Sequence, residues 1–196
     1  MIRGRWAACA LAAALFPACK SGPRWVPAQG TFSPPSGRYA VEFPAGWMRL
    51  GERDTVVASR DGLFLQRIDV FQHETGKPVG GTRKVVAAGM LPQEVAEVVQ
   101  DALASSRGMQ GVTVLENAPA LLDGRPGFKL LVAYKDRDGL RMKLVVYGAL
   151  VGDSLYELAY GAPERHYFDR DLPTFEHVRS TFRIAQPAVA RAAKTD

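Results

Sequence analysis

The sequence predicts an α+β fold in which a mainly antiparallel central sheet is flanked by helices. Segments of alternating apolar and polar residues recur along the chain, turns of a few residues join most of them, and two other segments have helical periodicity. Because short turns can join only antiparallel neighbours, most strands should pair in that way. The helices should then cover the sheet as an α/β/α sandwich.

The first part of the domain is expected to form three strands. Residues Tyr39–Phe43 alternate apolar and polar side chains, and a Pro-Ala-Gly-Trp turn at 44–47 follows them. A short strand at 55–58 and a longer one at 63–72 are separated by Asp61–Gly62, a dipeptide typical of hairpin turns. The last two strands should therefore pair with each other.

A helix is expected at 91–107. Pro92 lies in its first turn and Gly108 directly follows it, and these residue types favour the start and the end of a helix. Apolar residues recur along one side of the segment, at Val95, Val98, Val99, Ala102 and Leu103. This side should pack on the sheet.

The second half is expected to be a meander closed by a helix. A strand at 112–116 precedes three strands at 128–135, 140–151 and 155–160, which short turns connect, and a helix opens at 171–173. Large apolar residues on the inward side of these elements predict a buried core of Phe43, Trp47, Val99, Leu103, Phe128, Leu130, Leu144, Val146, Tyr156, Phe175, Val178 and Phe182.

Composition excludes several functional classes. The 196 residues are 47% hydrophobic and 23% charged, which suits one globular domain. The net charge of +5 is spread over scattered basic residues without a long basic run, so nucleic-acid binding is not expected. Cys9 and Cys19 both lie in the first twenty residues, so the domain has no disulfide and no thiol nucleophile or ligand.

The amino terminus has the layout of an export signal. A basic stretch at 1–5 is followed by an apolar run at 6–16 that is too short to span a bilayer. The run ending in Cys19 resembles a bacterial lipobox, which implies acylation of Cys19 and a stable bilayer anchor. The position three before the cysteine is Phe16 rather than the usual Leu, so ordinary cleavage near Ala18 is the alternative.

These features predict the organisation and location of the chain. We expect a signal peptide at 1–18, a lipidated Cys19 with a flexible Pro/Gly/Ser tether at 19–36, one globular domain at 37–184 and a disordered tail at 185–196. Residue 20 is Lys rather than the Asp that retains lipoproteins at the inner membrane. The expected location is the periplasmic side of the cell envelope, with the outer membrane favoured over the inner one.

Four short motifs occur in order along residues 37–184. They are Phe43-Pro44-x-Gly46-Trp47, Gly124-x-x-Gly127-Phe128, Leu155-Tyr156-x-Leu158-x-Tyr160 and Phe175-x-x-Val178-x-x-x-Phe182. In this order they resemble the PsbP-like superfamily, which contains PsbP, the DcrB-type bacterial lipoproteins and a Ran-binding nuclear import factor. The resemblance implies a central antiparallel sheet between helices and a mostly non-enzymatic, docking function. It carries over no site residue and no partner.

Catalytic and metal chemistry find little support. His73, His166 and His177 have no second histidine at metal-ligand spacing, and Asp69 lies about 13 Å from His73 along a strand. The sequence contains no Gly-x-Ser-x-Gly elbow and no phosphate-binding glycine loop. We therefore expect a non-enzyme without a metal or another cofactor.

The segment 164–171 is the most unusual stretch, because it combines both charge signs, an imidazole and two aromatic rings. As a functional loop it would bind a partner through Tyr160, Arg165, His166, Tyr167 and Arg170. The alternative, which we favour, is a solvated turn whose Tyr167 and Phe168 pack into the core.

Two functions remain open. The first, which we prefer because the strands carry large side chains throughout, is a membrane-tethered module that docks on another envelope protein or assembly. The second is a lipid or small-ligand carrier. A pocket of about 300 Å³ or more, with apolar walls and a few polar groups, would favour the carrier. A filled core with an exposed apolar patch would favour docking.

Overall fold

A computed structural model of the protein describes residues 24–50 and 54–185. The elements in chain order are β1 (Val26–Pro27), β2 (Gly30–Phe32), β3 (Tyr39–Phe43), β4 (Met48–Leu50), β5 (Val56–Ser59), β6 (Arg67–Glu74), α1 (Pro92–Ala104), β7 (Gln110–Leu122), β8 (Arg125–Lys135), β9 (Arg141–Val151), β10 (Ser154–Pro163), α2 (Tyr167–Thr181) and β11 (Arg183–Ile184).

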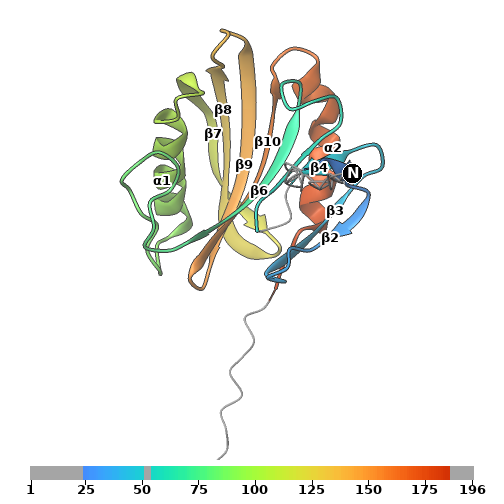
Figure 1. Ribbon diagram of the computed structural model, residues 1–196. Coiled ribbons are helices and arrows are strands. Elements are labelled where there is room, and N and C mark those ends of the chain that lie inside the picture. The colour runs from blue at the N-terminus through green and yellow to red at the C-terminus, as the bar shows by residue number, and fades with distance from the viewer. Residues whose placement is uncertain (1–23, 51–53, 186–196) are drawn as a thin grey trace, which may run out of the picture.

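An eight-stranded sheet forms the centre of the fold, with its strands in the order β1-β4-β5-β6-β10-β9-β8-β7 (Figure 1). Every neighbouring pair in this sheet is antiparallel. The strands β8, β9 and β10 are joined by short turns and form the expected meander. The α+β prediction is confirmed.

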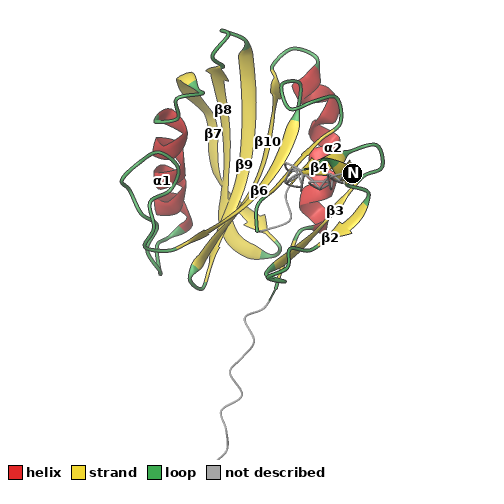
Figure 2. Cartoon of the chain, viewed as in Figure 1, coloured by secondary structure: helices red, strands yellow, loops and turns green. Residues whose placement is uncertain are grey.

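The two helices cover opposite faces of this sheet (Figure 2). Helix α1 packs on one face, over β7, β8 and β9. Helix α2 packs on the other face together with a small three-stranded sheet of order β11-β3-β2. Because successive side chains of a strand point to opposite faces, β10 places Leu155 and Ala159 in the α1 core, and Tyr156, Leu158 and Tyr160 in the α2 core.

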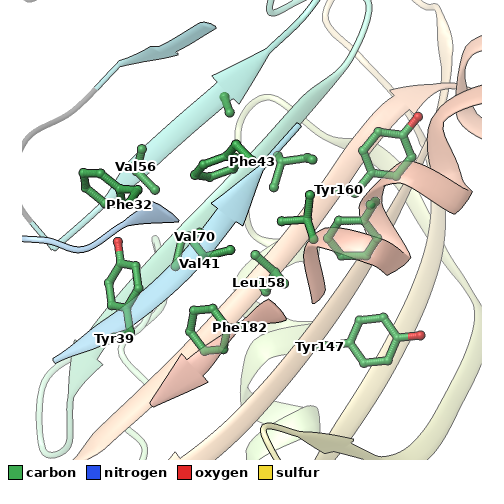
Figure 3. Packing of buried hydrophobic residues seen from close by; sticks show 14 of the residues in the cluster. Phe32, Tyr39, Val41, Phe43, Val56, Val70, Tyr147, Leu158, Tyr160 and Phe182 are labelled. Carbon is green, nitrogen blue, oxygen red and sulfur yellow. The ribbon is translucent and has the colours of Figure 1, made fainter. Parts of the chain in front are cut away.

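Aromatic rings fill the core on the α2 side (Figure 3). The ring centroids of Tyr39 and Phe182 lie 5.5 Å apart, and those of Tyr160 and Phe175 lie 5.4 Å apart. Contacts of this kind stabilise beyond the area that they bury. The expected core residues are all buried except Leu103, which is half-buried at the end of α1.

The expected tether at 19–36 contains structure over its second part. Residues 26–27 and 30–32 form β1 and β2, which pair with β4 and β3. Phe32 and Ala28 are buried, and the Phe32 ring lies 6.2 Å from that of Tyr39. Proline and glycine obscure the alternation of apolar and polar residues in this segment. Its two strands form because β4 and β3, which come later in the chain, supply their hydrogen-bonding partners.

Several element boundaries differ from the expected ones. The strand expected at 63–72 begins only at Arg67, because a turn at 62–65 precedes it. The strand expected at 112–116 runs from Gln110 to Leu122 with two irregularities in its register. Helix α1 ends at Ala104, before the expected Arg107.

The leader at 1–18, Cys19 and residues 186–196 lie outside the described residues. Within 24–50 and 54–185, neither helix has the length and apolar character needed to cross a bilayer.

Candidate functional site

The segment 164–171, the candidate docking loop of the sequence, contains the start of a helix. Helix α2 begins at Tyr167, four residues before the expected opening at Asp171, and His166 precedes it with a φ of 69°, in the left-handed region. Phe168 is buried and Tyr167 is half-buried, as the favoured alternative predicts.

The five candidate binding residues do not form one surface. Arg165, His166 and Arg170 are exposed, but Tyr160 is 0% exposed. The Tyr160 hydroxyl donates to the backbone oxygens of Tyr167 and Phe168 at 2.9 and 3.2 Å. Tyr160 therefore anchors the first turn of α2 and is unavailable to a partner, which corrects its assignment as a binding residue.

The charges of this segment tie α2 to the β5–β6 loop. Asp171 is buried and pairs with Arg60 at 3.0 Å and with Arg170 at 2.6 Å. Arg170 also pairs with Asp61 at 2.5 Å, and the side-chain amide of the buried Gln66 donates to both Asp61 and Asp171. This network gives the dense charge pattern a structural role. It also fixes the base of the loop.

A groove lies on the other face of the main sheet, beside the carboxyl end of α1. Its volume is about 580 Å³. The residues that line this sheet groove are Arg67, Asp69, Phe71 and His73 of β6, Glu157 and Ala159 of β10, Leu144 and Val146 of β9, Tyr134 of β8, Val99, Ala102 and Leu103 of α1, and Val79, Gly80, Gly81, Ser105, Ser106, Arg107 and Met109 of the connecting segments.

The groove exists because α1 covers only part of its sheet face. The helix packs mainly over β7, β8 and β9, so that part of β6 and β10 lines the groove beside the helix end. Gly80 and Gly81 let their loop approach the end of the helix: Gly80 has a φ of 57°, and a Cβ there would lie 3.1 Å from the Cβ of Ala102. The loop and the helix end together form one wall of the groove.

Two buried carboxylates lie on the strand floor of this groove. Asp69 is 3% exposed and Glu157 is 6% exposed. Asp69 is paired with Ala159 across β6 and β10, and Glu157 with Phe71, so the two acids are diagonal neighbours on one face. Such neighbours lie about 7–8 Å apart, close enough for one ligand head group to reach both.

Each carboxylate has one cationic partner that is more exposed than itself. The Nε atom of Arg67 lies 3.0 Å from Oδ2 of Asp69, and the Arg67 side chain is 50% exposed. The Nε2 atom of His73 lies 2.8 Å from Oε2 of Glu157. The acids thus lie deep in the groove and the cations toward its rim.

This environment shifts two pKa values. Burial raises the pKa of Asp69 to about 6, although the positive charge of Arg67 opposes the shift. The hydrogen bond to Glu157 raises the pKa of His73 above its usual value, and partial burial of the imidazole opposes this. Both groups can therefore change charge near physiological pH.

The sheet groove continues toward an exposed aromatic side chain. A second hollow of about 520 Å³ shares Arg67, Ser106, Arg107, Met109 and Tyr134 with it, and extends to Leu63 and Phe64 of the β5–β6 loop. Phe64 is 88% exposed. The loop that carries it is the one that the ion network holds against α2.

The sequence did contain a signal for this site. Asp69 stands within the apolar run Ile68–Phe71, and Glu157 within Leu155–Ala159, in strands that are otherwise buried. Charged residues are rarely buried unless they are paired, so such positions mark candidate sites. Asp69 and His73 do share a face, as the strand spacing implies, but no group of three potential metal ligands occurs among residues 24–50 and 54–185.

No protein-family model matches the sequence, and a search of curated proteins also finds no match. Solved structures do resemble the fold. PsbP of the cyanobacterium Synechocystis has a TM-score of 0.53 and 16% identity, with 87% of this chain and 99% of that chain covered. The Ran-binding protein Mog1p of Saccharomyces cerevisiae has a TM-score of 0.53 and 12% identity, with coverages of 83% and 95%.

A third similar structure is LpqN, a protein involved in cell envelope biogenesis of Mycobacterium tuberculosis. Its TM-score is 0.53 and its identity 14%, with 85% of this chain and 93% of that chain covered. The chain spans 49% of a further similar structure, from Bacteroides thetaiotaomicron. The fold is therefore PsbP-like, as the four sequence motifs imply.

Proposed function

We propose that this protein is a non-catalytic, membrane-tethered protein of the cell envelope that holds a small amphipathic molecule in the sheet groove. The observation that carries the proposal is the groove itself, with a volume of about 580 Å³, apolar walls and two buried carboxylates. Pockets for small ligands have roughly this size, at 300–1,000 Å³, and this mixture of walls. The groove therefore has the volume and the mainly apolar lining that favour a carrier over a docking module.

The arrangement of charges in the groove supports ligand binding. Asp69 and Glu157 each pair with a cation of the same groove, Arg67 and His73. Carboxylates that accept charge-assisted hydrogen bonds can orient a ligand and discriminate between charges. LpqN, which has the same fold, is involved in envelope biogenesis, and this is in keeping with a role in the envelope.

Attachment through Cys19 is part of the same proposal. The apolar run that ends at this residue supports acylation, and Lys20 supports the outer membrane. Membrane fractionation should recover the wild-type protein with the envelope and release Cys19→Ser into the soluble fraction. If both forms are equally processed and soluble, the proposed anchor is wrong.

The binding proposal is tested by asking what the purified protein retains. We expect mass spectrometry of organic extracts to find an amphipathic compound in the wild-type protein. Ser105→Trp should exclude it, because Ser105 is exposed and lines the groove. Ser180→Trp is the matched control, since Ser180 is exposed on α2, on the opposite face of the sheet. Equal ligand content in the two variants would contradict the proposal.

Docking on an envelope protein is the second candidate, and one observation favours it. Phe64 is 88% exposed at the tip of a loop that the Asp171 network holds in place. A fixed, exposed aromatic residue is typical of a contact residue. Photocrosslinking in cells from position 64 should then give one specific envelope adduct, and position 180 should give none. The earlier candidate positions 166 and 170 serve as a comparison.

A further inference from the structure

We propose that the sheet groove selects a ligand with a positively charged amine head and an apolar body. This inference rests on the proposed function, and adds to it the chemical class of the ligand. The head group would lie between Asp69 and Glu157, and the apolar body against the wall formed by Val99, Leu144 and Val146.

The first argument is that the negatively charged groups of the groove are more deeply buried than the positively charged ones. The carboxylates are 3% and 6% exposed, whereas the Arg67 side chain is 50% exposed and Arg107 is exposed at the rim. His73, the remaining charged group of the groove, is already hydrogen-bonded to Glu157. A ligand that reaches the strands at the base of the groove therefore meets two negatively charged groups that accept hydrogen bonds. An anionic head group would meet two carboxylates there.

The second argument is independent of the carboxylates and comes from α1. The helix ends at Ala104, and Ser105 and Ser106, which follow its last turn, both line the groove. The carboxyl end of a helix carries about half a negative charge from its unpaired carbonyl groups. The last turn of α1 contains no basic residue of its own. The carboxyl end of α1 and the two buried carboxylates therefore both favour a positively charged ligand.

The third argument is the apolar wall. Val99 of α1 and Leu144 and Val146 of β9 lie on the side of the groove away from β6, and all three belong to the buried core. They give the groove an apolar surface next to the two carboxylates. A ligand with a charged head and an apolar body matches both sides, whereas a small hydrophilic cation matches only the floor.

The test compares three probes that differ only in the head group: octylamine, octanol and octanoate. An alkylamine is protonated at neutral pH, since such amines have a pKa of about 10. We would titrate each into the chain carrying Cys19→Ser, and follow amide shifts of the groove residues and the affinity. Octylamine should bind at least about tenfold more tightly than octanoate, as expected for a charge-assisted hydrogen bond.

Variants connect this preference to the two carboxylates. Asp69→Asn and Glu157→Gln should each lower the octylamine affinity about tenfold and leave octanol within about twofold. Glu74→Gln, which removes an exposed carboxylate at the end of the same strand, should change neither. Circular dichroism would confirm that each variant is folded.

The outcomes separate the two proposals. If octanol and octanoate shift the groove amides while octylamine binds no better, or if both carboxylate variants keep the amine preference, the amine inference is overturned and the binding function stands. If none of the three probes shifts the groove amides, both are overturned.

Discussion

Replacing Asp69 with Asn should stabilise the protein at neutral pH. Asp69 is 3% exposed, and burial raises its pKa from 3.8 to about 6. A carboxyl whose pKa is raised on folding binds its proton more tightly in the folded state. Folding with Asp69 ionised therefore has an energetic cost, which is fully present above about pH 6 and disappears as the pH falls below 3.8.

The size of this energetic cost follows from the change in the Asp69 pKa on folding. Each tenfold change in proton affinity corresponds to about 1.4 kcal/mol, so the rise from 3.8 to about 6 corresponds to about 3 kcal/mol. Asn retains the shape of the carboxyl group and one acceptor oxygen, without the charge. Arg67, which loses its partner, is half exposed and can be solvated by water. We therefore expect Asp69→Asn to gain up to about 3 kcal/mol above pH 7.

Urea unfolding of both proteins, measured from about pH 8 to about pH 4, tests this expectation. The gain in free energy of unfolding should be largest at high pH and shrink through pH 6. Glu74→Gln is the control, because Glu74 is exposed and Lys77 lowers its pKa, so its removal should bring no gain. A loss of stability in Asp69→Asn at about pH 8, or a difference that is independent of pH, would refute the reasoning.

Three further predictions concern the groove partner and the two cores. In an NMR titration, the pKa of His73 should exceed its usual value, and the Glu157→Gln variant should lower it. The stability that the His73–Glu157 pair contributes should be present below about pH 6.5 and should be lost as the pH rises through the His73 pKa. Phe182→Ala should lower the free energy of unfolding by ~3–5 kcal/mol, since Phe182 is fully buried, and an unchanged urea midpoint would contradict its place in the core. Gly148→Ala should destabilise by ~1–3 kcal/mol, because a Cβ there would overlap the Phe128 ring, and thermal unfolding would detect the loss.

The regular elements were predictable from local sequence. The alternation in the meander placed β8, β9 and β10 within a few residues, and the apolar stripe of α1 identified the face that packs on the sheet. Periodicity reports such elements because a buried face imposes its spacing on the residues that form it. It misses β1 and β2, which are short, rich in proline and glycine, and held by β4 and β3.

The candidate site was harder to predict, for two different reasons. The charge-dense segment 164–171 is unusual in composition, but its Arg170 and Asp171 pair with Asp61 and Arg60, about a hundred residues earlier in the chain. Composition cannot distinguish a paired charge from a free one. Asp69 and Glu157 were harder to connect, because each is a single acid in an otherwise apolar strand and the two become neighbours only when β6 pairs with β10.

By itself, the sequence determined the class of fold and most of the core, and it predicts an export signal. These depend on interactions between residues close together in the chain, or on the polarity of each position. Only the tertiary structure decided where the sheet groove lies. The groove depends on how far α1 extends over its sheet face and on the pairing of β6 with β10, which joins residues at least eighty positions apart. No pattern among neighbouring residues predicts that these strands and the helix end lie together, because their arrangement results from the packing of the whole domain.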